Sequence, residues 1–187
     1  MSDEQANLIL TEKYKNSEMA KDLTKKYYDE VKNMDDVSKR LYLDMKMWIV
    51  DDILLKADKM TMANSIELRV PLLDKKMWEL ARTIPVRHKV HNEITKYAFR
   101  KAAENKLPQD WAKRRKAGFL VPFVNWIKEE KYYNIVKETF NKDFVGEFFD
   151  VQKINALLDD HFNNKENNGR KVYTIYTFLK WYEQYFI

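Results

Sequence analysis

The sequence predicts a mainly α protein, a compact bundle of about eight to ten helices. Its 187 residues include only 3 glycines and 4 prolines, whereas folds rich in strands need many turns built from these residues. Apolar residues recur at helical spacing among charged ones, and they make up 45% of the chain. This composition excludes a disordered chain and favours one well-buried core, or part of a larger one.

The first half of the chain is predicted to be a series of helices that begin at aspartates. Residues 5–32 have a helical pattern of apolar and charged residues. Asp35 or Asp36 can cap a second helix, and the pair Asp51 and Asp52 is predicted to cap a third. Aspartate suits this position because its carboxylate accepts hydrogen bonds from the free N–H groups of the first turn.

The prolines mark changes between extended chain and helix. "SIELRVPLLD" is predicted to be extended because Pro71 disfavours a helical conformation in the residue before it. Asp74 then caps a helix that ends before Pro85, "EITKYAFRKAAEN" is predicted to be helical, and a short helix starts at Pro108. Gly118 interrupts the chain after the basic run "KRRK".

The last third of the chain is predicted to be helical as well. Pro122 begins a helix, and two longer amphipathic helices follow. A polar loop from Asn163 to Gly169 separates these two helices.

The absence of cysteine excludes a disulfide framework, a thiolate metal site and a cysteine nucleophile. Asp159 and Asp160 stand near His161, but no further matching ligand cluster appears, so we expect the histidines on the surface and expect no metal site. A glycine-rich phosphate loop is excluded because the glycines stand far apart. The histidines are His88, His91 and His161, and the glycines are Gly118, Gly146 and Gly169.

The charge of the chain is mixed rather than strongly basic. Its formal net charge is +5, but 34 basic and 29 acidic residues are interleaved, which predicts a solvated exterior rather than a nucleic-acid surface. No stretch approaches the ~20 apolar residues of a membrane span, and the start "MSDEQANLIL" lacks the features of a signal peptide. We therefore expect a cytoplasmic protein without a membrane partner.

Four blocks stand in order between residues 44 and 126: "DMKMWIVDDILLKADKMTM", "SIELRVPLLD", "TKYAFR" and "KRRKAGFLVP". The second fits S-x-E-x-R-x-P-x-L-D at every fixed position, the third fits T-K-x-x-x-R, and the fourth fits R-x-K-x-G-F-x-x-P. Together they resemble the C-terminal part of the asparagine synthetase (glutamine-hydrolysing) family. Residues 1–43 resemble the family weakly and are expected to form a helical N-terminal segment, and residues 44–187 an asparagine synthase-type helical domain.

The resemblance implies the fold and the missing partners. It identifies the chain as similar to the helical C-terminal portion of an α/β synthetase domain of the adenine-nucleotide α-hydrolase-like (PP-loop) type. The family's S-G-G-x-D-S pyrophosphate loop and its nucleophilic cysteine do not occur in this sequence. The N-terminal nucleotide-binding and glutaminase domains are therefore expected as missing partners, and this fragment alone is expected to lack a complete active site.

The resemblance also implies the activity of the parent enzyme, an ATP-dependent carbon–nitrogen ligase of asparagine biosynthesis. Such an enzyme activates aspartate as an acyl-adenylate and amidates it with ammonia from glutamine. ATP and Mg²⁺ would serve the parent enzyme, and this chain alone is expected to bind neither. Departures from the motifs, such as Lys59 where the family mostly has arginine, leave another carboxylate substrate open. A basic helical module that binds nucleic acid or a protein also stays open.

The resemblance places one catalytic residue, Lys116, on a loop over the nucleotide. An ammonium there would stabilise the negative charge that grows on phosphoryl oxygens and on a tetrahedral oxyanion, and Gly118 would let the loop open and close. The competing interpretation of this segment is a basic helix end followed by a capping glycine. A helical domain without its sheet would also expose apolar surface, so we expect self-association.

Three further residues are predicted to contact the nucleotide. Lys96 and Arg100 are four residues apart, which places both on one face of a helix, where they could reach phosphate or simply solvent. Arg69 alternates with Glu67, so both side chains leave one face of an extended segment. That geometry suits a buried ion pair, the favoured interpretation, or a substrate contact.

Overall fold

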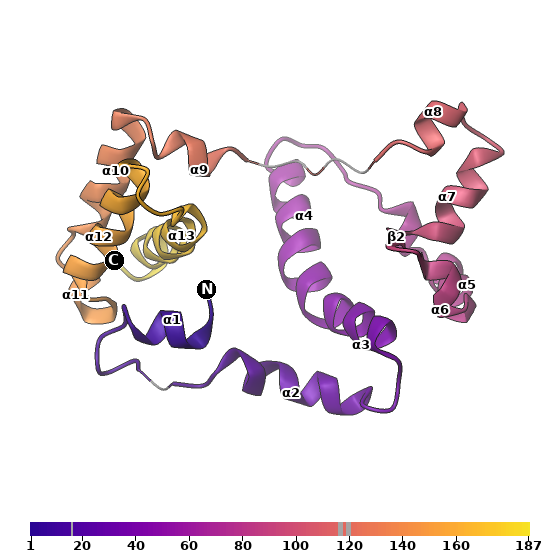
Figure 1. The fold of residues 1–187 in the computed structure, drawn as a ribbon, viewed down its shortest axis with the longest axis horizontal. Coiled ribbons are helices and arrows are strands. Elements are labelled where there is room, and N and C mark those ends of the chain that lie inside the picture. The colour runs from indigo at the N-terminus through magenta and orange to yellow at the C-terminus, as the bar shows by residue number, and fades with distance from the viewer. Residues whose placement is uncertain (16, 116–117, 119–120) are drawn as a thin grey trace. The chain divides into compact units, whose positions relative to one another are not determined.

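The computed structural model describes residues 1–15, 17–115, 118 and 121–187, and it confirms a mainly helical chain (Figure 1). The chain divides into two units. The terminal unit consists of Met1–Ala20 and Gly118–Ile187, and the middle unit consists of Lys21–Ala117. The division predicted between residues 43 and 44 differs from these two units and stays a prediction.

The terminal unit is a helical bundle with a well-packed core. Most of the largest fully buried side chains come from its three longest helices, and they include Phe140, Ile154, Leu158, Ile175 and Leu179. These residues lie one or two turns apart on each helix, which is the spacing of an apolar helix face. The helices of this unit are α1 (Asp3–Asn7), α9 (Phe123–Trp126), α10 (Glu130–Phe140), α11 (Val145–Phe148), α12 (Val151–Phe162) and α13 (Gly169–Phe186).

The segment after α1 pairs with the chain before α12, although the two are far apart in sequence. The N–H of Asp150 donates to the carbonyl of Ile9 at 2.8 Å, and the N–H of Thr11 donates to the carbonyl of Phe148 at 2.9 Å. The prediction of a helix over residues 5–32 is therefore wrong. Buried Ile9 lies in the turn after α1, and the next residue, Leu10, forms a bridge with Phe149, so α1 ends at Asn7 and the next helix, α2 (Ala20–Glu30), starts later.

The short helix α9 is fixed to the terminal unit by two contacts of Val124. His161 donates a hydrogen bond from Nε2 to the Val124 carbonyl at 2.8 Å, because that carbonyl can only accept. The Val124 side chain also lies so close to Gly169 that a Cβ there would be 2.7 Å from Cγ1. The prediction of a surface position is wrong for His161, which is 1% exposed, because its ring serves this internal contact.

The middle unit begins with α2 and a long run of helix. Asp35 caps this run, as predicted, through a hydrogen bond from the Ser38 N–H at 3.0 Å. The run comprises α3 (Asp36–Leu43), η1 (Asp44–Leu54) and α4 (Leu55–Met62), which follow one another directly. The predicted cap at Asp51 and Asp52 is therefore wrong. The Asp52 carboxylate instead accepts a hydrogen bond from Trp48, one turn before it, at 2.8 Å.

The rest of the middle unit carries a small hairpin between helices. Asp74 caps α5 as predicted, since it accepts the N–H of Lys76 at 2.9 Å. Strands β1 and β2 are antiparallel, and they replace the first part of the helix predicted over "EITKYAFRKAAEN", which begins only at Tyr97. The elements are η2 (Pro71–Leu73), α5 (Lys75–Thr83), α6 (Val86–Lys89), β1 (Val90–His91), β2 (Ile94–Thr95), α7 (Tyr97–Glu104) and α8 (Gln109–Ala112).

The two units differ in how far their apolar side chains are buried. The contiguous core of buried residues lies in the terminal unit, whereas many large apolar side chains of the middle unit are exposed, Trp48, Met60, Leu72 and Leu80 among them. Each of these four exposes more than half of its surface. Among the described residues, no helix has the length and apolar character that crossing a membrane requires.

Candidate functional site

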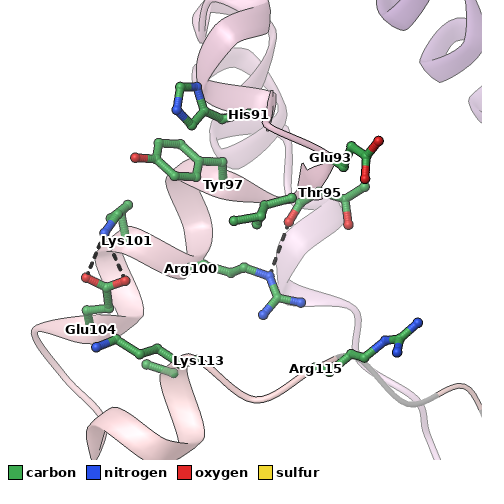
Figure 2. A pocket seen from close by; sticks show the side chains of 11 residues that line it. His91, Glu93, Thr95, Tyr97, Arg100, Lys101, Glu104, Lys113 and Arg115 are labelled. Atoms are coloured by element: carbon green, nitrogen blue, oxygen red, sulfur yellow. Dashed lines mark hydrogen bonds and ion pairs between the residues drawn. The ribbon is translucent and has the colours of Figure 1, made fainter.

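The hairpin and helices α7 and α8 of the middle unit enclose an open pocket of about 660 Å³ (Figure 2). The hairpin turn consists of Asn92 and Glu93, which both have positive φ angles, 46° and 65°. Two such residues form the turn whose twist matches that of paired strands. The turn sends β2 back beside β1, and α7 then leaves β2 along the edge of the pocket.

Arg100 is the central side chain of the pocket, and its contact with Thr95 is visible in Figure 2. Its guanidinium contacts two backbone carbonyls in all. Its Nε donates to the carbonyl of Thr95 at 3.2 Å, and its Nη1 donates to the carbonyl of Arg114 at 3.0 Å. Thr95 belongs to β2, whereas Arg114 lies in the basic run just after α8. Arg100 therefore links the hairpin to the start of the basic run.

A second group of side chains forms one side of the pocket. The ammonium of Lys101 donates to both carboxylate oxygens of Glu104 at 3.1 Å, and this hydrogen bonding raises the pKa of Lys101 above its ordinary value. The rings of His91 and Tyr97 lie 4.7 Å apart between centroids, next to this ion pair. Aromatic pairs at this distance stabilise each other by about 0.5–1.5 kcal/mol beyond their burial.

The remaining cations give the pocket an excess of positive charge. Lys113 and Arg115 also line it, and among the described residues their side chains have no hydrogen bond or ion pair. Glu93 is the second acid of the lining besides Glu104. Since the lining carries more cations than carboxylates, the pocket attracts an anionic ligand such as a phosphate group.

The sequence-predicted site residues are only partly brought together. The predicted catalytic residue Lys116 lies outside the described residues. Arg100 lines the pocket, whereas Lys96 and Arg69 do not. Lys96 and Arg100 do not share a helix face as predicted, because α7 begins at Tyr97 and Lys96 precedes it in the left-handed conformation, with φ 56°.

Arg69 forms the predicted ion pair with Glu67, at 2.7 Å, but the pair is not buried. The two side chains are 82% and 68% exposed. Charges paired at such an exposed place contribute little to stability, at most about 1 kcal/mol. The pair therefore leaves the Arg69 guanidinium within reach of a ligand.

Sequence reasoning missed the hairpin and the pocket cation Lys101. One signal for the hairpin is present in "VHNEIT", where two short strand-like pairs flank a two-residue turn. Among the described residues, no three histidine, aspartate or glutamate side chains are grouped so that they could hold a metal ion.

Comparison with known proteins gives a consistent result. A family model described as asparagine synthase matches residues 2–183. Asparagine synthetase [glutamine-hydrolyzing] 1 of Bacillus subtilis strain 168 is 42% identical over 165 residues, which are 87% of this chain and 26% of that protein. A putative asparagine synthetase [glutamine-hydrolyzing] of Mycobacterium tuberculosis strain H37Rv is 34% identical over 161 residues, 86% of this chain and 25% of that protein. The chain spans about a quarter of the length of these curated relatives. No solved structure matches it.

Proposed function

Because this chain belongs to the asparagine synthase family, we propose that it is the helical C-terminal part of an enzyme that makes asparagine from aspartate, ATP and ammonia from glutamine. The observation that carries the proposal is the pocket of the middle unit, where Lys113 and Arg115 make no hydrogen bond or ion pair with any described residue. These two residues flank Arg114 and directly precede Lys116 in the sequence. The most basic run of this sequence thus begins at a pocket with an excess of cations.

The chemistry of the reaction explains why cations are needed there. The aspartate side-chain carboxylate attacks the α-phosphorus of ATP, and the bond to pyrophosphate breaks. Ammonia then attacks the acyl carbon of the adenylate, a proton is lost from nitrogen, and AMP leaves. Negative charge grows first on the phosphoryl oxygens and then on the tetrahedral oxyanion, and one fixed donor can stabilise such a charge by about 2.7–4 kcal/mol. We assign this role to Lys116.

Lys96 is proposed to bind the phosphates from the end of β2. Its left-handed backbone, with φ 56° and ψ 34°, costs a residue other than glycine about 1–2 kcal/mol. Strain of this kind is concentrated at functional sites, where the surrounding structure maintains it. Arg69, whose guanidinium is exposed, is proposed as a further contact to the nucleotide or the substrate.

The isolated chain is proposed to be inactive because its described residues supply cations but no metal ligand set and no glycine-rich phosphate loop. We expect no AMP when residues 1–187 are incubated with ATP, Mg²⁺, aspartate and ammonia. Robust aspartate-dependent formation of AMP by this chain would show that the site is complete and would overturn this part of the proposal.

A chimera tests the function directly. In it, this chain replaces the matching 165-residue region of Bacillus subtilis asparagine synthetase 1. We expect the chimera to form asparagine and AMP, and we expect Lys116→Gln to lower kcat by about 10²–10³-fold, the effect of removing one oxyanion donor. Lys106→Gln is the matched control, since Lys106 is exposed and does not line the pocket. A folded chimera without activity, or equal activity of the two variants, contradicts the proposal.

We also propose that the isolated chain self-associates. The exposed apolar side chains of the middle unit, such as Trp48 and Met60, offer a surface that water does not solvate well. Sedimentation velocity over a range of concentrations should show a dimer or a larger species, and Trp48→Glu with Met60→Glu should shift it toward monomer. A monomer at all concentrations argues against self-association.

A further inference from the structure

The two hydrogen bonds of the Arg100 guanidinium link separate segments of the backbone. Arg100 lies on α7, and its own N–H donates to the carbonyl of Lys96 at 2.9 Å, so its backbone is fixed in the first turn of the helix. From there Nε and Nη1 bind the carbonyls of Thr95 and Arg114. The second carbonyl is 14 residues away in the sequence, so this contact holds two separate segments together.

The segment at Arg114 is not held in place by the helix before it, because that helix is short. Helix α8 has only the four residues Gln109–Ala112 and cannot be stable by itself. Its last hydrogen bonds run from the N–H of Lys113 to Gln109 at 3.0 Å and from the N–H of Arg114 to Trp111 at 3.3 Å. Beyond these bonds, the contact from Arg100 fixes the direction in which the basic run leaves α8.

The connection from α7 to α8 supports the same arrangement. The Leu107 N–H donates to the carbonyl of Ala103 at 2.8 Å, and the Gln109 side-chain amide donates to the carbonyl of Glu104 at 3.1 Å. The start of α8 is thereby tied to the end of α7, on which Arg100 lies. The position of Arg114 is thus determined through the backbone connection and through the Arg100 side chain.

We propose that Arg100 is a positioning residue that fixes the basic run at Arg114, rather than a ligand of the phosphates. Both acceptors are uncharged carbonyls, so they do not neutralise the positive charge of the guanidinium in the pocket. The planar geometry of the guanidinium holds the two backbone segments in place. A lysine cannot replace it, since a single ammonium nitrogen cannot reproduce the fixed fork that reaches both carbonyls. The part of this inference that concerns catalysis rests on the proposed function, whereas the part that concerns the backbone does not.

Limited trypsin digestion of the whole chain tests the positioning role without any activity assay. The basic run of residues 113–116 contains four cleavage sites. Lys113, Arg114 and Arg115 are exposed, and the rate of cleavage after these three reports how often this part of the chain leaves its fixed conformation. We expect Arg100→Gln to raise the rate within this run about tenfold, which corresponds to about 1.4 kcal/mol. Arg100→Lys should raise it by a similar factor, although it keeps the charge.

Lys101→Gln is the matched control, because it removes one cation and one cleavage site from the same helix without touching Arg114. Its cleavage rate in the run should equal that of the unmodified chain. Faster cleavage of Arg100→Gln after Lys131, in α10 of the terminal unit, would indicate that this variant unfolds generally. The cleavage rate of Arg100→Lys within the basic run is then the test of the positioning role. Wild-type protection in Arg100→Lys, or equal rates in Arg100→Gln and Lys101→Gln, overturns the proposal.

The chimera separates positioning from phosphate binding. A positioning role predicts that Arg100→Lys lowers kcat about tenfold or more with little change in the KM for ATP. A phosphate ligand predicts the opposite, a retained kcat and a raised KM for ATP in variants that lose the charge. If the unmodified chimera is inactive, the proposed function fails, but the trypsin result still decides whether Arg100 positions the backbone.

Discussion

Gly169→Ala is expected to destabilise the terminal unit, because the added methyl would occupy space that Val124 fills. A Cβ at residue 169 would lie 2.7 Å from Val124 Cγ1 and 2.8 Å from Cγ2. Favourable contacts between carbon atoms are about 3.5–4.0 Å long, so one of the two groups must move. Valine is branched at Cβ and has few rotamers, and α9 is held in place by the hydrogen bond between His161 and the Val124 carbonyl.

The magnitude follows from two opposing effects. Forcing an additional carbon into a packed place costs about 1–3 kcal/mol. Alanine is a better helix former than glycine by about 0.8–1.0 kcal/mol in a helix interior, and by less here because Gly169 is the first residue of α13. We therefore expect the free energy of unfolding to fall by about 1–2 kcal/mol. The midpoint of urea unfolding, followed by circular dichroism at constant slope, measures this change.

Val124→Ala provides the control, because it removes both γ carbons and leaves only Cβ, 3.0 Å from the new methyl. Gly169→Ala should then cost at least about 1 kcal/mol less in the Val124→Ala background than in the unmodified chain, as residues in contact are coupled by 0.5–3 kcal/mol. An unchanged or raised stability of Gly169→Ala would refute the reasoning. The same loss in both backgrounds would show that Val124 is not the obstacle.

Three further predictions concern hydrogen bonds of single side chains. His161→Phe should lower the free energy of unfolding by about 1–3 kcal/mol in the same urea assay, because it leaves the Val124 carbonyl without its donor. The backbone N–H of Lys153 bonds to Asp150 and holds the pKa of that carboxyl below its ordinary value of 3.8. The stability that the ionised carboxylate adds is therefore complete above pH 3.8 and is lost as the pH falls through the lower, folded-state pKa. The difference in unfolding free energy between the unmodified chain and Asp150→Asn should shrink on acidification from pH 6 to pH 2.5. A constant difference speaks against this prediction. Asp74→Ala should destabilise α5 by about 1 kcal/mol, seen as faster amide hydrogen exchange in that helix, with unchanged exchange counting against the cap.

The sequence was sufficient to predict elements whose signals are local. Asp35 and Asp74 cap the helices that they were predicted to cap, because a carboxylate three residues or fewer before free N–H groups needs no distant partner. The two long helices α12 and α13 follow from an apolar stripe with helical period and from the polar loop between them. The four motifs likewise predicted the family that the comparison confirmed.

Other features depend on partners that lie far away in the sequence. The chain leaves the helical conformation at Ile9 because its carbonyl accepts the N–H of Asp150, and His161 is buried because the Val124 carbonyl needs a donor. Neither partner can be recognised from the residues around Ile9 or His161. Asp52 failed as a cap for a different reason, since Trp48 offers it a side-chain donor one turn earlier and the helix continues through it.

The candidate site shows the same division between chemistry and placement. The family resemblance predicted a cationic site and named Arg100, but the role of a cation depends on what its hydrogen bonds reach. Lys101 forms an ion pair with Glu104, and Arg100 donates hydrogen bonds to two backbone carbonyls. Lys113 and Arg115 make no such contact with any described residue, so they retain both charge and hydrogen-bonding capacity for a ligand.

This distribution of contacts separates two kinds of damage to the site. Loss of Lys113 or Arg115 removes attraction for an anion and should weaken its binding more strongly at low salt than at high salt, since exposed charges are screened. Loss of Arg100 removes the same formal charge but also frees the Arg114 carbonyl, so its effect should persist at high salt. Comparing the salt dependence of inorganic pyrophosphate binding in Arg115→Gln and Arg100→Gln, by calorimetry on the chimera, therefore distinguishes the two roles. Identical salt dependence would mean that Arg100 acts through its charge alone.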